Sequence, residues 1–382
     1  MNIGLSQGVN LAENNIIAIL RLIELSTRVR MAECEPDTSS VIVVNNGILH
    51  LDTWEIEEFS PDKIYFSKIP VDYVPDAGKP TMFNNYVDSC FKGNEAQKDL
   101  LQELFGYTLL KNYKYQNIFY LLGHGGNGKG IALSILGYLS GEHNYASESI
   151  HQLTDHLQVD YHVAKLHGKH ANICGDISIK TIVNTETIKK LTSNTDPVAA
   201  RNPYERPFSF VNYAKIVVAL NRLPQTDAFT TGDKRRNLII SFNNKFSETD
   251  NEIKGLQCVI RDAGEMPGIL LWAIEGLKRL EANQKFSDTR TIAQKAVEYE
   301  KKSRPARYYV EERLEELSGN LVPNALVYED FNRFCVAIGA AELSQNEIKR
   351  SILQECYEAG WDVTNKITRV KSLPDLTQKL LP

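Results

Sequence analysis

The sequence predicts an α/β protein centred on a parallel β-sheet, and three apolar runs separated by helical segments carry this prediction. The runs are residues 117–122, 170–176 and 214–221. The second and third stop at a polar residue, Asp176 and Asn221, as buried parallel strands do at their ligand-facing ends. The first leads into a glycine-rich loop and then into apolar residues at helical spacing, so strand, loop and helix follow one another.

The composition is that of a globular protein with more than one domain. A chain of 382 residues is longer than a single hydrophobic core usually organises, and 42% of its residues are hydrophobic. The 43 basic and 48 acidic residues give a formal net charge of −5, which argues against nucleic-acid binding over a whole basic face. Residues 180–236 are an exception, because they carry ten Lys and Arg against five Asp and Glu.

The cysteines and the N-terminus indicate the compartment. Six cysteines lie far apart without a Cys-x-x-Cys pair, so neither a disulfide framework nor a thiolate zinc site is predicted. The first residues show no basic segment leading into an apolar core, and no run approaches the ~18 apolar residues of a membrane span. We therefore expect a cytoplasmic protein without a membrane partner.

The N-terminal third combines helices with a small β element. Apolar spacing predicts a helix over residues 16–29. Residues 41–60 alternate apolar and polar around an Asn-Gly step, which predicts a hairpin. Residues 82–110 turn helical again, and we expect Gly106 and the polar run after it to close this unit.

The C-terminal part is predicted to be helical. Residues 265–282 form an amphipathic pattern with proline near its start, and residues 289–305 form a charged connecting helix that ends at Pro305. Beyond residue 321, two amphipathic helices and a terminal hairpin are expected. A winged-helix-like domain and a plain helical packing domain both fit this pattern.

The glycine-rich loop, Gly123-His124-Gly125-Gly126-Asn127-Gly128-Lys129-Gly130, matches the G-x-x-x-x-G-K phosphate-binding pattern up to its last position. Glycines let the backbone amides turn toward phosphate oxygens, and the following helix presents its positive end. Lys129 adds a charge for the β and γ phosphates. The loop therefore predicts binding of a nucleoside triphosphate.

Gly130 stands where Ser or Thr normally ligates Mg²⁺. A water molecule can fill that position, since Mg²⁺ keeps several waters in most nucleotide sites. The alternative is a loop that binds nucleotide weakly and does not hydrolyse it. Asp176 is the candidate acid for the metal or for the attacking water, and a surface aspartate at a strand end is its alternative.

Two further segments are candidates for the same chemistry. Asn221 could position water against the γ-phosphate, or it could be a turn asparagine before Pro224. The run Lys234-Arg235-Arg236 could be a solvated face. In ring ATPases, however, an arginine from the neighbouring subunit stabilises the transition state, and this run could supply one.

Five histidines fall within twenty residues, but they do not predict a zinc site. No cysteine or paired acid accompanies them, and their spacing fits neither i, i+4 on a helix nor a zinc finger. They are His151, His156, His162, His167 and His170.

The order of these motifs resembles the superfamily 3 helicase core of phage and plasmid primase-helicases, the group that includes the poxvirus primase-helicase. The resemblance covers roughly residues 42–285. It implies a P-loop AAA+ core at residues 111–286 and an α+β collar or oligomerisation domain at residues 1–110. It also implies a small, mainly helical domain at residues 287–382, with a winged-helix-like fold as one of the two alternatives.

The resemblance also implies roles for the candidate residues. Asp176 would be the Walker B acid that holds Mg²⁺, Asn221 the sensor, and Arg235 or Arg236 the finger that acts in trans. The Walker A residues that bind ATP would be Gly123, Gly125, Gly126, Asn127, Gly128, Lys129 and Gly130. Gly130 and the single acid at Asp176 depart from the family pattern and put the rate of hydrolysis in question.

Such helicases form hexameric rings on single-stranded DNA, with a hairpin from each subunit in the pore. Here the candidate hairpin is Pro197–Phe210, whose Arg201, Tyr204 and Arg206 offer cations for phosphates and an aromatic ring for a base or sugar. Lys190, beside Lys189, is a weaker DNA contact. The alternative is an ordinary polar hairpin.

The expected function is that of an ATP- and Mg²⁺-dependent hexameric DNA helicase or translocase. It would form the motor portion of a phage or plasmid replication protein, with a primase or polymerase module upstream in the same polypeptide. The alternative is a nucleotide-gated ring that holds a polymerase or primase on DNA without productive unwinding, and Gly130 is the feature that favours it.

Overall fold

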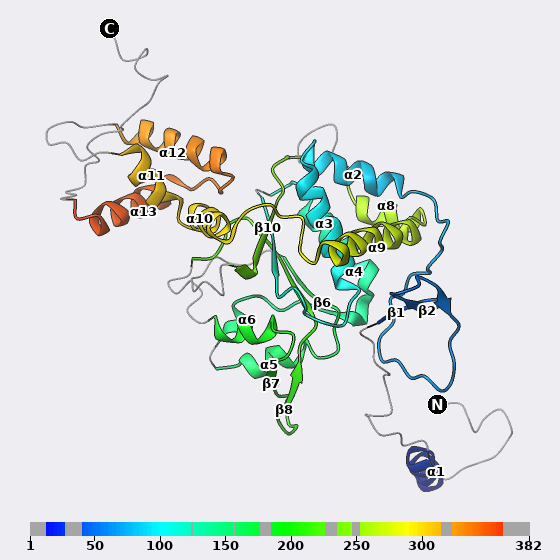
Figure 1. Ribbon diagram of the computed structural model, residues 1–382. Coiled ribbons are helices and arrows are strands. Elements are labelled where there is room, and N and C mark those ends of the chain that lie inside the picture. Colours follow the sequence, from blue (N-terminus) through cyan, green and yellow to red (C-terminus); the bar gives the residue numbers. More distant parts are fainter. Residues whose placement is uncertain are drawn as a thin grey trace.

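The computed structural model describes residues 13–26, 40–123, 125–155, 157–175, 185–225, 235–246, 253–314 and 323–361. A central sheet carries helices on both faces, and a small helical unit lies at one end of the molecule (Figure 1). Within the described residues, no helix is both long enough and apolar enough to cross a membrane.

The central sheet has five parallel strands in the order β10-β4-β9-β6-β5. In chain order this is 5-1-4-3-2, so the first strand lies between the fourth and the fifth. The strands are β4 (Ile118–Leu122), β5 (Tyr145–Ala146), β6 (Ala171–Cys174), β9 (Lys215–Leu220) and β10 (Asn237–Ser241). Their central positions are buried, because both faces of a parallel sheet are covered.

Helices cover the two faces and enclose two hydrophobic clusters, as the predicted α/β fold with a P-loop core requires. One face packs against α2 (Thr81–Phe91), α3 (Glu95–Thr108), α4 (Lys129–Ser140), α8 (Leu256–Asp262) and α9 (Met266–Asn283). The other face packs against α5 (Val159–Ala164), α6 (Glu186–Leu191) and the turn η3 (Gln152–Thr154). The turn η2 (Glu142–Asn144) contacts α4. The predicted α/β class is therefore confirmed.

Gly106 lies inside α3 and does not close the helical unit as the sequence predicted. A Cβ atom at this position would lie 2.4 Å from the Ala273 carbonyl oxygen of α9. Gly276 of α9 faces α3 in the same way, because its Cβ would lie 2.4 Å from the Gln102 carbonyl oxygen. The two glycines therefore let the backbones of α3 and α9 come into direct contact. Helix α3 continues past Gly106 and ends at Thr108.

The predicted hairpin is present as β1 (Val41–Val44) and β2 (Gly47–His50), with β3 (Ile56–Glu57) as a third strand. Asn45 and Asn46 form its two-residue loop. A Cβ atom at Gly47 would lie 2.5 Å from the Glu57 carbonyl oxygen, so the close approach of β3 requires this glycine. The predicted N-terminal helix is α1 (Glu13–Ser26).

The predicted connecting helix is α10 (Ile292–Ser303), which a capping box at Thr291 starts. Pro305 ends it and occupies the first turn of α11 (Pro305–Arg313). The small unit at the end consists of α11, α12 (Asn324–Ile338) and α13 (Gln345–Glu358), which share their own hydrophobic cluster. The expected terminal hairpin lies outside the described residues.

His170, at the start of β6, gives the fold a testable acid sensitivity. Its Nδ1–H donates to the Thr108 carbonyl oxygen at 3.2 Å, and its Nε2 lies 3.2 Å from the Ser67 hydroxyl. Burial, aided by the charges of Lys111 and Lys215, lowers the pKa of His170 to about 3. The ring is therefore neutral in the folded protein at pH 5.

We expect the free energy of unfolding to fall as the pH is lowered from 6.5 toward 3, because only unfolded His170 takes up a proton there. The loss from this group is about 2 kcal/mol between pH 7.5 and 5, at ~1.4 kcal/mol per pH unit below the unfolded pKa. Urea unfolding of the wild type and of His170→Asn at both pH values measures it. Equal pH dependence in the two proteins would contradict this assignment.

Candidate functional site

The glycine-rich loop joins β4 to α4 at the carboxyl edge of the sheet. Gly126 and Gly128 have φ angles of 73° and 90°, which L side chains rarely adopt. A Cβ atom at Gly123 would lie 2.3 Å from the Phe242 carbonyl oxygen, so a close backbone approach requires glycine here. Because α4 begins directly after Gly128, its unpaired N-terminal amides lie at the loop.

Lys129 is buried, and its ammonium group lies at the centre of the loop. Its Nζ donates to the Gly123 carbonyl oxygen at 2.6 Å, to Asn127 Oδ1 at 3.0 Å and to Asn221 Oδ1 at 3.2 Å. The structure thus brings the predicted Walker lysine and the predicted sensor asparagine into direct contact. Lys129 begins α4, at the end of the loop that follows β4, and Asn221 directly follows β9, the strand that pairs with β4.

The loop borders an open cleft of about 870 Å³. Besides the loop, Gly175 and Asn221, its lining includes the apolar side chains of Phe246, Ile253 and Leu256. A lining that combines the loop and its lysine with apolar side chains suits a ligand with phosphates and a flat ring. Sequence reasoning did not identify these apolar residues, because the stretch from the end of β10 to the start of α8 at Leu256 carries no motif.

Tyr86 of α2 is a second contributor that the sequence did not reveal. Its hydroxyl donates to the Gly128 carbonyl oxygen at 2.8 Å, and a Cβ atom at Gly128 would lie 3.0 Å from its ring. Burial raises the pKa of Tyr86 well above 10, so the phenol stays protonated and can donate. The neighbouring Cys90 is a buried thiol whose pKa burial raises to about 12. Helix α2 therefore packs against the loop at Gly128.

The metal side of the site is only partly described. Apart from its own helix backbone and chain neighbours, no described residue has an atom within 4 Å of the position where a Cβ of Gly130 would lie. Ser134, one helical turn further on, lines the cleft. Asp176 lies outside the described residues, directly after Gly175 in the chain.

Arg235 and Arg236 lie at the opposite edge of the sheet from the loop. They precede β10, whose first residue pairs with Ile118 at the start of β4, whereas the loop follows the end of β4. Five strand residues at ~3.3 Å each separate these edges by roughly 16 Å. The two arginines therefore cannot reach the loop of their own chain. Lys234 lies outside the described residues.

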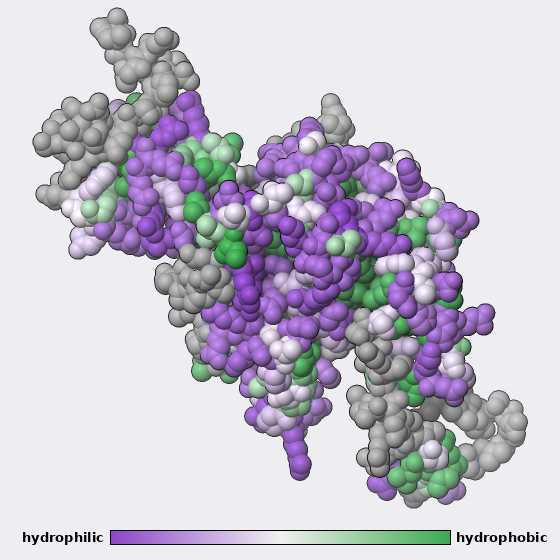
Figure 2. Space-filling view, viewed as in Figure 1, coloured by the Kyte–Doolittle hydropathy of each residue, from purple (hydrophilic) through white to green (hydrophobic). Residues whose placement is uncertain are grey.

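The predicted hairpin is formed by β7 (Pro197–Ala200) and β8 (Phe208–Val211), which pair antiparallel. Figure 2 shows its tip as a hydrophilic protrusion at the lower end of the molecule. Tyr204 is fully exposed there with a φ of 65°, a left-handed conformation that is unfavourable for a tyrosine. Arg201 and Arg206 are exposed beside it, and neither forms an ion pair within the described part of the chain.

Lys190 is placed less favourably for a DNA contact. It lies on α6, and its Nζ pairs with Glu186 Oε1 at 2.8 Å. Glu186 raises the pKa of Lys190 through this hydrogen bond. Lys190 thus has an ion-pair partner on its own helix, whereas Arg201 and Arg206 have none among the described residues.

The histidines occupy separate positions. His162 pairs with Glu148, His167 contacts the two hairpin phenylalanine rings, and His170 is buried at β6. His156 lies outside the described residues. Across the ranges that the structure describes, no three His, Cys, Asp or Glu side chains gather in a group that could hold a metal ion.

Two protein families match parts of the chain. Residues 10–92 match the family described as D5 N terminal like, which is the N-terminal part of primase-helicases. Residues 121–236, from β4 to the two arginines, match a family of unknown function, DUF5906. The first match bears out the resemblance to primase-helicases that the sequence predicted.

One curated relative and several solved structures are similar to the chain. The uncharacterized mitochondrial protein ymf21 of Marchantia polymorpha is 25% identical over 129 residues, which is 31% of this chain and 71% of that protein. The apo C-terminal region of NrS-1 is 14% identical, with a TM-score of 0.48 over 94% of this chain and 90% of that one. A ligand-bound JCV helicase is 12% identical, with a TM-score of 0.32 over 70% of this chain and 68% of that one.

Proposed function

We propose that this chain is the motor portion of a replication primase-helicase, which hydrolyses ATP to move along single-stranded DNA. The contact between Lys129 and Asn221, at the carboxyl edge of a 5-1-4-3-2 parallel sheet, carries the proposal. It supports a site in which a residue of the fourth strand senses the phosphate that the loop lysine holds. Mg²⁺, held with Asp176, would neutralise phosphate charge.

In this proposal the hydrolysis site is completed by a neighbouring subunit. The arginines that precede β10 lie too far from the loop of their own chain, so they would serve the loop of the next copy. A closed ring repeats this interface between all neighbouring subunits. In such a ring, the hairpin of every subunit would point toward one strand of DNA in the central pore. The hairpin tips then form a local basic surface in a protein whose net charge is −5.

The hairpin assignment is tested by the double variant Arg201→Ala, Arg206→Ala. We expect weaker oligo-dT binding and a shallower dependence on salt, by about 1.4 in the slope of log K against log salt, since each phosphate contact on a single strand contributes ~0.7. Fluorescence anisotropy of labelled oligo-dT at several salt concentrations measures both.

A matched control for the hairpin is Arg307→Ala, Arg333→Ala. It removes the same charge from exposed arginines of α11 and α12, each paired with a glutamate of its own helix. ATP affinity should be unchanged in both double variants. If the hairpin variant and the control lose the same amount of DNA affinity, the hairpin assignment is wrong.

Gly130 provides a gain-of-function test of the metal site. Because no described residue outside this helix crowds a Cβ at Gly130, serine fits and restores the hydroxyl that G-x-x-x-x-G-K loops usually carry next. Gly130→Ser should lower the Mg²⁺ concentration that supports half-maximal ATP hydrolysis several-fold. Gly130→Ala fits equally well but offers no oxygen, so identical Mg²⁺ titrations of the two variants would contradict the prediction.

A nucleotide-gated ring that holds a polymerase or primase on DNA without unwinding remains the second candidate. The absence of a hydroxyl at Gly130 favours it. Such a ring would assemble with ATP and show no turnover that single-stranded DNA stimulates.

A further inference from the structure

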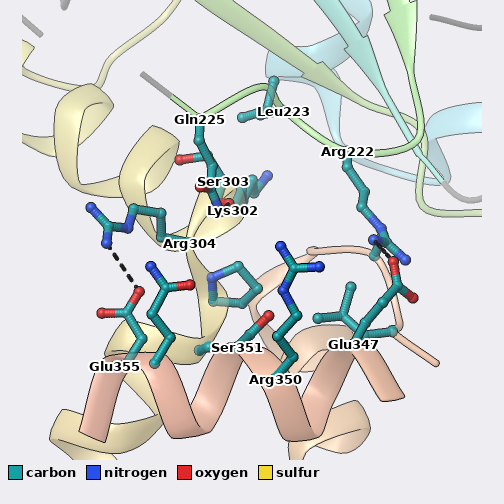
Figure 3. A pocket seen from close by; sticks show the side chains of 15 residues that line it. Arg222, Leu223, Gln225, Lys302, Ser303, Arg304, Glu347, Arg350, Ser351 and Glu355 are labelled. Atoms are coloured by element: carbon teal, nitrogen blue, oxygen red, sulfur yellow. Dashed lines mark hydrogen bonds and ion pairs between the residues drawn. The ribbon is translucent and has the colours of Figure 1, made fainter. Parts of the chain in front are cut away.

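A pocket of about 370 Å³ lies between the sheet and the C-terminal helices, away from the phosphate-binding loop (Figure 3). Three segments line it: residues 222–225 after β9, residues 302–306 between α10 and α11, and part of residues 341–355 on and before α13. We call it the seam pocket, since the motor core and the small helical unit meet there.

The lining of the seam pocket is positively charged. It contains four cations and two carboxylates, a difference of +2, in a chain with a net charge of −5. The cations are Arg222, Lys302, Arg304 and Arg350, and the carboxylates are Glu347 and Glu355. Amide and hydroxyl groups of Gln225, Gln354, Ser303 and Ser351 add further polar atoms.

Three of the cations already have partners in the protein. Lys302 Nζ lies 2.9 Å from Glu298 Oε1 and 3.0 Å from the Ser241 hydroxyl, so it is occupied by the core. Arg222 reaches Glu347 Oε1 at 2.9 Å, and Arg304 reaches Glu355 Oε1 at 3.1 Å. The last two pairs are partly exposed, and such pairs contribute little to stability, so an incoming anion can rearrange them.

The guanidinium group of Arg350 and the Nε of Arg304 have no hydrogen-bond acceptor among the described residues. Arg350 projects from α13 toward the pocket in Figure 3 and forms no ion pair or hydrogen bond with any described residue. The Nε of Arg304 is shielded from solvent and has no hydrogen-bond partner among the described residues. A buried donor without a partner is unfavourable, and a ligand oxygen would satisfy it once the Arg304 side chain turns toward the pocket.

We propose that the seam pocket binds a phosphate group, with Arg350 and Arg304 as its principal donors. Guanidinium groups match phosphate oxygens in geometry and charge, and the lining offers more donors than acceptors. Its volume suits a phosphate with little more than a sugar attached. The phosphate can come from a small molecule or from the backbone of single-stranded DNA, and the chemistry of recognition is the same.

The seam pocket is distinct from the loop site, but it is connected to it. Arg222, which lines the pocket, directly follows Asn221, whose side chain contacts Lys129. A phosphate that breaks the ion pair between Arg222 and Glu347 would therefore move the residue next to Asn221, the sensor candidate. The binding proposal itself does not depend on ATP hydrolysis.

The test uses the full chain in a Lys129→Ala background, so that the loop does not contribute phosphate binding. Calorimetry with inorganic phosphate and anisotropy with oligo-dT lacking terminal phosphates are run on this protein and on two further variants of it. Arg350→Gln removes the free guanidinium. Lys349→Gln makes the same charge change at the adjacent, exposed position of α13, which does not line the pocket.

We expect Arg350→Gln to weaken inorganic phosphate binding about ten-fold or more, the loss of one charge-assisted hydrogen bond of ~1.5–3 kcal/mol, and Lys349→Gln to change it little. If oligo-dT binding weakens selectively in Arg350→Gln and free phosphate does not bind, the proposal holds with DNA as the source. If the two variants behave alike toward both probes, the proposal is wrong.

Discussion

Lys129→Ala is expected to reduce ATP hydrolysis by at least about 100-fold, because removal of one preorganised donor to a developing charge typically costs 10²–10³ in rate. In the structure only 7% of Lys129 is exposed, and its Nζ already contacts three oxygens at the loop. A bound triphosphate would replace these acceptors with phosphate oxygens. Alanine leaves the loop backbone in place but without its charge.

Single-turnover hydrolysis, with and without oligo-dT, measures this effect. The urea midpoint of Lys129→Ala shows whether the variant remains folded, since Asn127 and Asn221 lose a partner. DNA-stimulated turnover in the wild type and its loss in the variant support the motor. Undiminished turnover in a folded Lys129→Ala protein would overturn the site, and ATP-dependent assembly of the wild type without turnover would favour the scaffold.

The parts of the site that the sequence predicted are those encoded in short segments. The loop is recognisable because its glycines, its lysine and the helix after it are contiguous. The strands that contain Ile173 and Val217 are recognisable because parallel strands are apolar along their whole length. The hairpin was also predictable, because its two strands and its turn lie within one short segment, residues 197–210.

Contacts between distant segments could not be predicted. Tyr86 meets Gly128 across 42 positions, and nothing in an amphipathic helix marks one tyrosine as the donor to a loop. Gly106 looked like the end of a helix, because a glycine at a helix end and a glycine at a helix crossing have the same local sequence. β10 was missed because it directly follows a basic run, which looked like a solvated face.

The sequence left Arg235 and Arg236 equal as candidates for the arginine that acts in trans, and the structure separates them. Arg236 is half-buried, and its Nε donates to the Thr192 hydroxyl at 3.0 Å. Arg235 is exposed, and its guanidinium donates to Gln116 Oε1 at 2.7 Å on the surface. A side chain that must cross an interface needs this exposure, so we propose Arg235 as the finger.

Arg235→Ala should lower ATP hydrolysis by about 10³-fold, the lower limit for arginine fingers in related chemistry, while each subunit still binds ATP. Mixing Arg235→Ala with Lys129→Ala subunits should restore part of the activity. In a mixed ring, some interfaces pair an intact loop from one subunit with an intact arginine from the next. The fraction of such interfaces follows from the mixing ratio, so activity should peak at an intermediate ratio.

Arg236→Ala is the matched comparison for the finger. Its loss removes a bond to Thr192 within the same chain, so we expect a lower urea midpoint and no recovery on mixing beyond that of the single proteins. If Arg236→Ala is rescued by Lys129→Ala subunits and Arg235→Ala is not, the two roles are reversed. If no mixture recovers activity, neither arginine acts across an interface between subunits.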